Sequence, residues 1–273
     1  MTAPFPTHKQ EEWRYADLDA LRPVWQQFAE PLTLTVGPGE TFEKMWLPGD
    51  EDVLVRRVQI ALEKGARARI FALNTAAVYG RIELEVSLEE AAEFELFGAN
   101  IGTEVSTNEI VTNVRHVGAG GRSRQTIRSV LNGKAVGSYL GKVEVARGAQ
   151  KTDAEQSVKA MLLDRGATAN CKPELEIFAD DVKCAHGATV GELDADQVFY
   201  LRSRGLPRIE AEKLIVGGFF TEVLDEMPLE SMREFTRDFI LRKVELAADG
   251  AAPDGAPGSR FDYGALEGGE GAA

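Results

Sequence analysis

Hydrophobic and polar residues alternate along the middle of the chain in a succession of short segments. Residues 81–88, Arg-Ile-Glu-Leu-Glu-Val-Ser-Leu, show the pattern most clearly, with Ile82, Leu84, Val86 and Leu88 on one face. Alternation with a period of two is typical of a β-strand that buries one face. Similar segments occur at residues 53–62, 68–73, 92–99, 109–117, 124–131, 138–145, 153–163, 169–178 and 182–190. The pattern predicts a mainly β fold.

Small Gly-Ala turns separate several of these segments, at residues 65–66, 118–119, 148–149, 166–167 and 187–188. The strands follow one another without helices, which excludes a doubly wound sheet, because its crossovers need about a dozen residues. A β-sandwich or barrel stays open, although it favours hairpin turns such as Asn-Gly and only Asn132-Gly133 offers one. A β-solenoid needs recurrent small turns and one inward apolar row per strand. The pattern favours the solenoid, over residues 51–192.

The two ends of the chain differ from the middle. Residues 1–50 contain several prolines and are expected to form a short, partly helical lead-in. Residues 193–248 show the period of amphipathic helices, with Asp194 as an N-cap and Pro207 and Pro228 at the next two helix starts. We expect these helices to cover the last coil, where strand edges would be unpaired. Residues 249–273 are rich in Gly, Ala, Pro and acidic residues and are expected to be disordered.

Charge and composition narrow the class of protein. The formal net charge of -13 argues against nucleic acid as a partner, and the basic residues Arg122, Arg124 and Arg128 are expected to lie on a solvated face. No signal peptide and no apolar stretch of about 20 residues is present, so we expect a cytoplasmic protein without a membrane partner. Residues 137–142 lack the spacing of a phosphate-binding loop, and the common hydrolase motifs are missing. We therefore expect a non-enzymatic protein that binds no nucleotide itself.

The candidate chemistry is concentrated in residues 180–189, Asp-Asp-Val-Lys-Cys-Ala-His-Gly-Ala-Thr. This stretch places Cys184 two residues from His186 in a chain with only 2 cysteines and 3 histidines. In an extended strand these side chains share a face, about 6 to 7 Å apart. Thiolate and imidazole suit iron, zinc and copper, and Asp180 and Asp181 could orient the imidazole or tune the thiol. The alternative is that Cys184 is a small core residue and His186 a polar residue at a strand end.

The chain alone does not complete a metal site. Structural zinc takes four ligands, but the other cysteine is Cys171, in an earlier segment, and His8 and His116 lie in distant segments. If Cys184 and His186 act as ligands, the pattern favours a partial or transient site, or one completed by a second subunit.

Residues 172–191, followed by residues 197–205, closely resemble the C-terminal core of the SufB/SufD family of the Suf iron–sulfur cluster assembly scaffold, and within it SufD-like subunits. A looser likeness extends to residues 131–163 and to Glu12-Trp-Arg-Tyr-Ala-Asp-Leu18 near the N-terminus. The resemblance implies a right-handed parallel β-helix with flanking helical regions. It agrees with the solenoid that the periodicity favours.

The resemblance also implies an assembly of the SufBCD kind. A SufB-like subunit would pair through the solenoid, and a SufC-like ABC-type ATPase would dock on the C-terminal helices around residues 199–226. His186 would lie at the interface of the two solenoid subunits, with Cys184 beside it, where a transient iron–sulfur cluster or iron is held. The SufB-like subunit would supply a cysteine and a glutamate, and ATP hydrolysis would belong to the ATPase.

Two other functions stay open. One is a structural interaction protein in which Cys184 and His186 have no metal role. The other is a carbohydrate-active β-solenoid enzyme, which would need paired acids on one exposed face. Asp180 and Asp181 do not meet this need, because adjacent residues on a strand point to opposite faces and cannot straddle a glycosidic bond.

Overall fold

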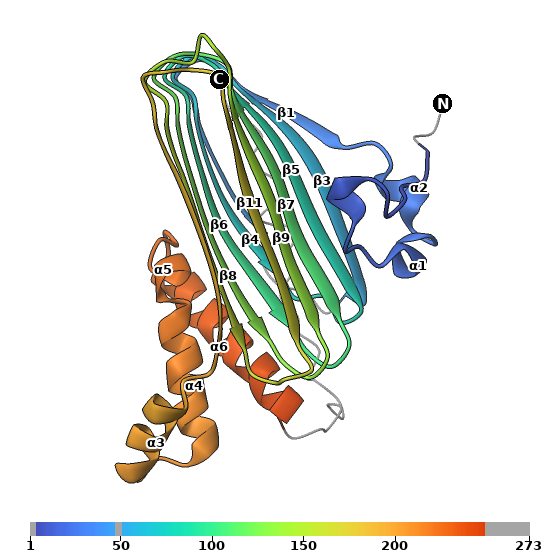
Figure 1. The fold of residues 1–273 in the computed structure, drawn as a ribbon, viewed down its shortest axis with the longest axis vertical. Coiled ribbons are helices and arrows are strands. Elements are labelled where there is room, and N and C mark those ends of the chain that lie inside the picture. The colour runs from blue at the N-terminus through green and yellow to red at the C-terminus, as the bar shows by residue number, and fades with distance from the viewer. Residues whose placement is uncertain (1–3, 47–50, 249–273) are drawn as a thin grey trace.

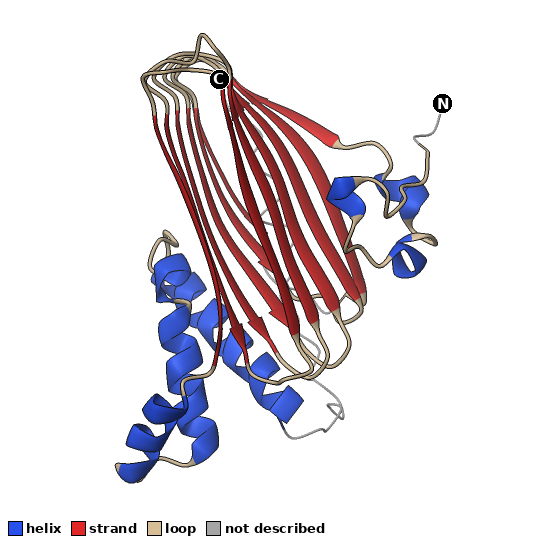
Figure 2. Cartoon of the chain, viewed as in Figure 1, coloured by secondary structure: helices blue, strands red, loops and turns tan. Residues whose placement is uncertain are grey.

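The chain folds into a β-solenoid of two parallel sheets, with helices packed on both outer faces (Figures 1 and 2). A computed structural model describes residues 4–46 and 51–248. Residues 249–273, which the sequence predicts to be disordered, lie outside this range. The order of the elements and the two parallel sheets confirm the expected mainly β solenoid with C-terminal helices.

Each coil contributes one strand to each sheet. Sheet A has the order β1 (Leu32–Val36), β3 (Val53–Leu62), β5 (Tyr79–Leu88), β7 (Thr107–His116), β9 (Val136–Val145) and β11 (Thr168–Ile177). Sheet B has the order β12 (Lys183–Glu192), β10 (Asp153–Leu162), β8 (Arg122–Leu131), β6 (Glu93–Gly102), β4 (Arg67–Asn74) and β2 (Thr41–Trp46). Strands β1 and β2 lie in the range that the sequence assigns to the lead-in.

The interior of the solenoid consists of aligned rows of like residues. Neighbouring strands are parallel and in register, so Ile60, Val86, Val114, Val143 and Leu175 follow one another through sheet A. The first four are buried and the last packs against them from the final coil. The alternation of each strand thus becomes one continuous apolar core between the sheets.

Turns between strands rely on residues that tolerate positive φ. Gly65 and Gly133 have φ of 68° and 64°, a region that favours glycine. A Cβ atom on Gly133 would also lie 2.9 Å from the carbonyl oxygen of Glu104 in the preceding coil. Asn132-Gly133 joins β8 to β9, which belong to different sheets, so it forms no hairpin. Gly187-Ala188 lies within β12 instead of in a turn.

The N-terminal residues cover part of the outer face of sheet A. They form η1 (Glu11–Trp13), α1 (Leu18–Leu21) and α2 (Trp25–Phe28). Trp13, Leu21 and Trp25 pack with Val55 and Tyr79 of the sheet. The Arg57 guanidinium donates to the carbonyl oxygens at the end of α2, 2.8 Å from that of Ala29. This small helical unit is anchored to the first coils.

Among the described residues, four C-terminal helices follow β12, and all but the first of them pack on the outer face of sheet B, on the opposite side of the solenoid (Figure 1). They are α3 (Ala195–Ser203), α4 (Arg208–Phe219), α5 (Thr221–Leu224) and α6 (Glu230–Ala248). The Asp194 carboxylate caps α3 as expected, since it accepts from the backbone N–H groups of Asp196 and Gln197.

The expectation that these helices cover the last coil is wrong. Phe71 and Phe97 stack on the outer face of sheet B, 5.2 Å apart, and Phe220 and Met227 of the helical region pack with them in one cluster. This face offers the helices a large apolar surface to bury. The last coil therefore stays open, and nearly all of β12 is exposed.

Candidate functional site

Cys184 and His186 lie on the last strand of the solenoid and face its interior. Their register partners on β10 are Ala154 and Gln156, which are both buried between the sheets. Within residues 4–46 and 51–248, strand β12 pairs with β10 alone, so no further coil of the described chain covers it. Cys184 is half-buried against the core, whereas His186 is exposed. The two side chains therefore share one side of the open end.

Cys171 faces the same interior from the other sheet. It lies on β11, in register with the buried Tyr139, and packs against the core. Strands β11 and β12 form the final coil, so both cysteines belong to the open end. Both are free, and burial raises the pKa of each thiol. They are protonated at neutral pH, and a bound metal or a nearby cation would be needed to favour the thiolate.

A group of buried polar residues lies beneath this end, and the sequence analysis missed it. The Tyr139 hydroxyl donates to Oε1 of Gln125 at 3.0 Å and accepts from Nε2 of Gln156 at 3.0 Å. It also lies 3.1 Å from the Thr112 hydroxyl. All four side chains are buried. A sequence signal existed, because polar residues occupy inward positions of strands that are otherwise apolar there.

Burial affects the tyrosine at the centre of this group. The side chain of Tyr139 is 1% exposed, and burial raises its pKa to about 12. The hydroxyl therefore stays protonated at physiological pH and acts only as a hydrogen-bonding group. The group orders the interior just below the last coil.

Other residues considered from the sequence do not join the site. Asp180 and Asp181 lie exposed in the turn before β12, where the Asp181 backbone N–H donates to Gln150. The carboxylate that affects the pKa of Cys184 is that of Asp153. His8 lies beside Trp13, and His116 is buried with Nε2 2.9 Å from the Ser123 hydroxyl. Burial lowers the pKa of His116 to about 4.

The site holds too few ligands to form a metal centre on its own. Among residues 4–46 and 51–248, no group of three or more His, Cys, Asp and Glu side chains is arranged to hold a metal ion. The open end presents one imidazole and two half-buried thiols. Chemically it can contribute ligands to a shared site, but it cannot enclose an ion by itself.

A second exposed surface lies on the first two C-terminal helices. In α3 no residue is buried, and Phe199 is 73% and Tyr200 55% exposed. Leu214 of α4 is 57% exposed, although Ala211 and Val216 of the same helix are buried. Figure 1 shows α3 and the start of α4 beyond the ends of the strands. This apolar surface has no partner within the described part of the chain.

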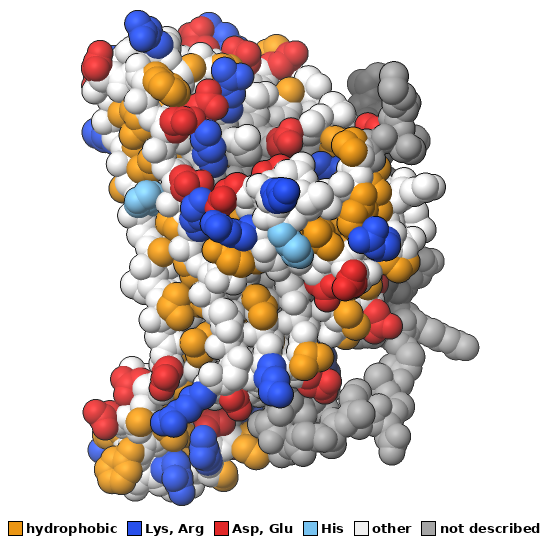
Figure 3. Space-filling model, turned by 45° about the vertical axis from the view of Figure 1, so that its right-hand side comes forward, with side chains coloured by type: hydrophobic (Ala, Val, Ile, Leu, Met, Phe, Trp, Pro, Cys, Tyr) orange, Lys and Arg blue, Asp and Glu red, His pale blue; other side chains and the backbone are white. Residues whose placement is uncertain are grey.

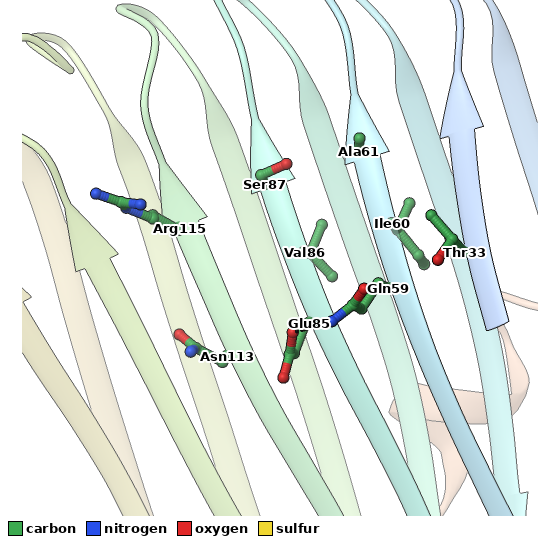
Figure 4. Close-up of a pocket in the computed structure, with 9 residues that line it drawn as sticks. All are labelled: Thr33, Gln59, Ile60, Ala61, Glu85, Val86, Ser87, Asn113 and Arg115. Carbon is green, nitrogen blue, oxygen red and sulfur yellow. Dashed lines mark hydrogen bonds between the residues drawn. The ribbon is translucent and has the colours of Figure 1, made fainter. Parts of the chain in front are cut away.

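Elsewhere on the surface of the described residues, charged side chains lie next to partners of opposite charge. Arg124 pairs with Glu95 and Arg128 with Glu222, while Arg122 lies in register between Glu93 and Asp153. These arginines therefore form no basic patch, and Arg128 is 1% exposed, so it does not lie on the solvated face that the sequence predicts. Figure 3 shows basic and acidic side chains interspersed on the face that it presents. A shallow hollow on sheet A, shown in Figure 4, holds side chains that lie side by side along the strands. No helix in the described residues is long and apolar enough to cross a membrane.

Comparison with known proteins identifies a family and several relatives that this chain resembles. Residues 44–219 match the family described as SUF system FeS cluster assembly, SufBD core domain. An iron–sulfur cluster assembly SufBD family protein of Synechocystis is 38% identical over 177 residues, which are 64% of this chain and 39% of that protein. The SufD proteins of Escherichia coli and Bacillus subtilis are 39% and 33% identical, over 41% and 53% of this chain.

The matched regions are a minor part of these relatives. They cover 26% of the Escherichia coli protein and 33% of the Bacillus subtilis protein. The family match, in contrast, covers most of the chain and includes the solenoid from β3 to β12, with Cys184 and His186. The chain belongs to the SufBD family of iron–sulfur cluster assembly proteins.

Proposed function

We propose that this chain is a SufD-like scaffold subunit that contributes His186, and with it Cys184, to an iron–sulfur site shared with a SufB-like subunit. The carrying observation is the open last coil, which exposes His186 beside an unpaired strand edge. An unpaired edge of this length is a template for a strand of another chain. Such a partner would bring its own side chains over Cys184 and His186.

The incomplete ligand set supports this assignment. Iron and sulfide would be the substrates here, held transiently while the cluster forms. Two protonated thiols and one imidazole give a weak site until the partner adds ligands and excludes water. A site that closes only on assembly suits a scaffold that must later release its cluster. Of Cys184 and His186, Cys184 is the weaker candidate, because it is half-buried whereas His186 is exposed, and we assign no role to Cys171.

We also propose that a SufC-like ATPase docks on the C-terminal helices. The exposed aromatic residues Phe199 and Tyr200 on α3 are the support for this surface, since aromatic side chains are common anchors at interfaces. Helices α5 and α6 are packed on sheet B, so motion at this surface would be passed to the solenoid. ATP hydrolysis would occur in the partner, in the cytoplasm, and this chain would be non-enzymatic.

The test is co-expression with SufB-like and SufC-like subunits, followed by measurement of iron and acid-labile sulfide in the purified complex. We expect His186→Ala to assemble but to hold several-fold less cluster, because one ligand of the shared site is lost. His8→Ala removes an exposed histidine far from β12 and is the matched control. Normal cluster content in His186→Ala would exclude this histidine from the mechanism and favour a structural interaction protein.

A further inference from the structure

A column of polar side chains runs through the interior of sheet B and ends at His186. Gln125 on β8, Gln156 on β10 and His186 on β12 occupy the same register position. Neighbouring strands lie about 4.8 Å apart, so residues in register stack directly on one another. Gln156 is therefore the side chain immediately beneath the imidazole of His186.

The amide of Gln156 has a defined orientation. Its Nε2 atom donates to Tyr139 Oη, which in turn donates to Oε1 of Gln125. In this arrangement the amide nitrogen of Gln156 faces the Tyr139 hydroxyl. The carbonyl oxygen is left as a pure acceptor at the other end. Gln156 is 1% exposed, and Oε1 is buried without a hydrogen-bond donor among the described residues.

Burying an amide oxygen without a hydrogen-bond donor costs free energy. An arrangement that brings a donor to Gln156 Oε1 removes this cost and is therefore favoured. Two donors are stacked against Gln156. Gln125 lies one coil deeper, and its Nε2 also lacks a partner in the described residues. His186 lies on the open side and is free to turn its ring, because the side chain is exposed. Cys184, the nearest residue on that face of β12, lies over Ala154 instead.

We propose that Gln156 is the positioning residue of His186, with its Oε1 accepting a hydrogen bond from Nδ1–H of the imidazole. Nδ1 is the ring nitrogen nearer the backbone and can reach the column when the ring turns inward. Nε2 then carries the lone pair and faces the open end, where a ligand atom is needed. This inference rests on the proposed function for its purpose, but the hydrogen bond can be tested without it.

The test is the tautomer of His186 in the full chain, read from the ring ¹⁵N chemical shifts at a pH well above the usual imidazole pKa of about 6.5. The signals are assigned by their loss in His186→Ala. We expect the Nδ1–H form to predominate in the native chain. Gln156→Met keeps a similar side-chain volume but removes the Oε1 acceptor. In this variant we expect the Nδ1–H tautomer of His186 to be the minor form.

Thr112→Val is the matched control, because it also removes a contact to the Tyr139 hydroxyl but keeps Gln125 as the acceptor of that hydroxyl. The control variant should leave the His186 signals unchanged. In Gln156→Met, the ring signals of the buried His116 should also stay unchanged. The proposal fails if the native chain shows mainly the Nε2–H form, a result that needs no variant to fold. It also fails if Thr112→Val shifts the tautomer as much as Gln156→Met.

Cluster content separates this inference from the proposed function. In the co-expressed complex, Gln156→Met should lower cluster content less than His186→Ala does, and Thr112→Val should leave it unchanged. A tautomer shift together with normal clusters in His186→Ala would disprove the function but keep the hydrogen bond. Reduced clusters in His186→Ala without a tautomer shift in Gln156→Met would disprove only the positioning role.

Discussion

Arg81 is a fully buried cation on the outer face of sheet A, beneath the N-terminal unit. Its guanidinium lies 2.8 Å from Glu83 Oε2, 3.2 Å from Glu109 Oε2 and 3.7 Å from the centre of the Trp13 ring. Burial raises the pKa of the Glu109 carboxyl, and the charge of Arg81 opposes this shift. The arginine thus compensates two buried acids and also anchors Trp13.

We predict that Arg81→Met lowers the free energy of unfolding by about 3–5 kcal/mol, because it leaves the buried Glu109 without its cation, while Glu83 keeps its pair with Arg57. Urea unfolding followed by circular dichroism measures the change. Arg115→Met, which breaks the exposed pair with Glu144, should cost less than about 1 kcal/mol. Adding Glu109→Gln to Arg81→Met should recover part of the loss. Equal effects of Arg81→Met and Arg115→Met would contradict this account.

Among the elements, the C-terminal helices combine a buried and an exposed part. Phe220, between α4 and α5, is completely buried against sheet B, while Phe199 on α3 is largely exposed. Ion pairs of Glu222 with Arg128 and of Glu226 with Arg69 add to the attachment near α5. The helices therefore have one end fixed to the solenoid and one end available to a partner.

A pair of phenylalanine variants separates these two roles. Phe220→Ala should destabilise the fold by about 3–5 kcal/mol, because it leaves a cavity in a packed cluster. Phe199→Ala should change stability by no more than about 0.5 kcal/mol, as expected at an exposed position. It should instead weaken capture of the SufC-like ATPase in a pulldown. Full ATPase capture by Phe199→Ala would show that α3 is not the docking surface.

On the scale of the whole molecule, the solenoid has two open ends. Among the strands that the structure describes, β1 and β2 pair on one side only at the start, and β11 and β12 do so at the finish. The central coils are paired on both sides, and most positions of β5 to β8 are buried. Stability in such stacks depends on contacts between neighbouring coils, so the ends are the least stable parts.

Hydrogen–deuterium exchange read by mass spectrometry tests this gradient. We predict the fastest strand exchange in β12 and β1 and the slowest in β5 to β8. Adding a SufB-like partner should slow exchange in β11 and β12 and leave β1 unaffected, because only the former would gain a strand neighbour. Uniform protection along the free chain, or protection at β1 instead, would be inconsistent with pairing at the last coil.

Much of the fold could be predicted from the pattern of residues. The strand that contains Ile82 to Leu88 is predictable from the sequence, because each strand of a solenoid places apolar residues at its inward positions. The cap at Asp194 was clear for a local reason, since the bonds it makes lie within three residues. The arrangement of the C-terminal helices was not predictable, because it depends on Phe71 and Phe97 meeting only after the coils stack.

The local sequence predicts only part of the arrangement of the candidate site. Alternation within one strand determines that Cys184 and His186 share a face, and the same rule makes the core apolar. Their exposure at an open end, and the presence of Gln156 beneath His186, depend on which strands become neighbours. Residues of one column are separated by a whole coil in sequence. The periodicity of the chain determined the solenoid, and only the stacking of its coils decided what lies at its end.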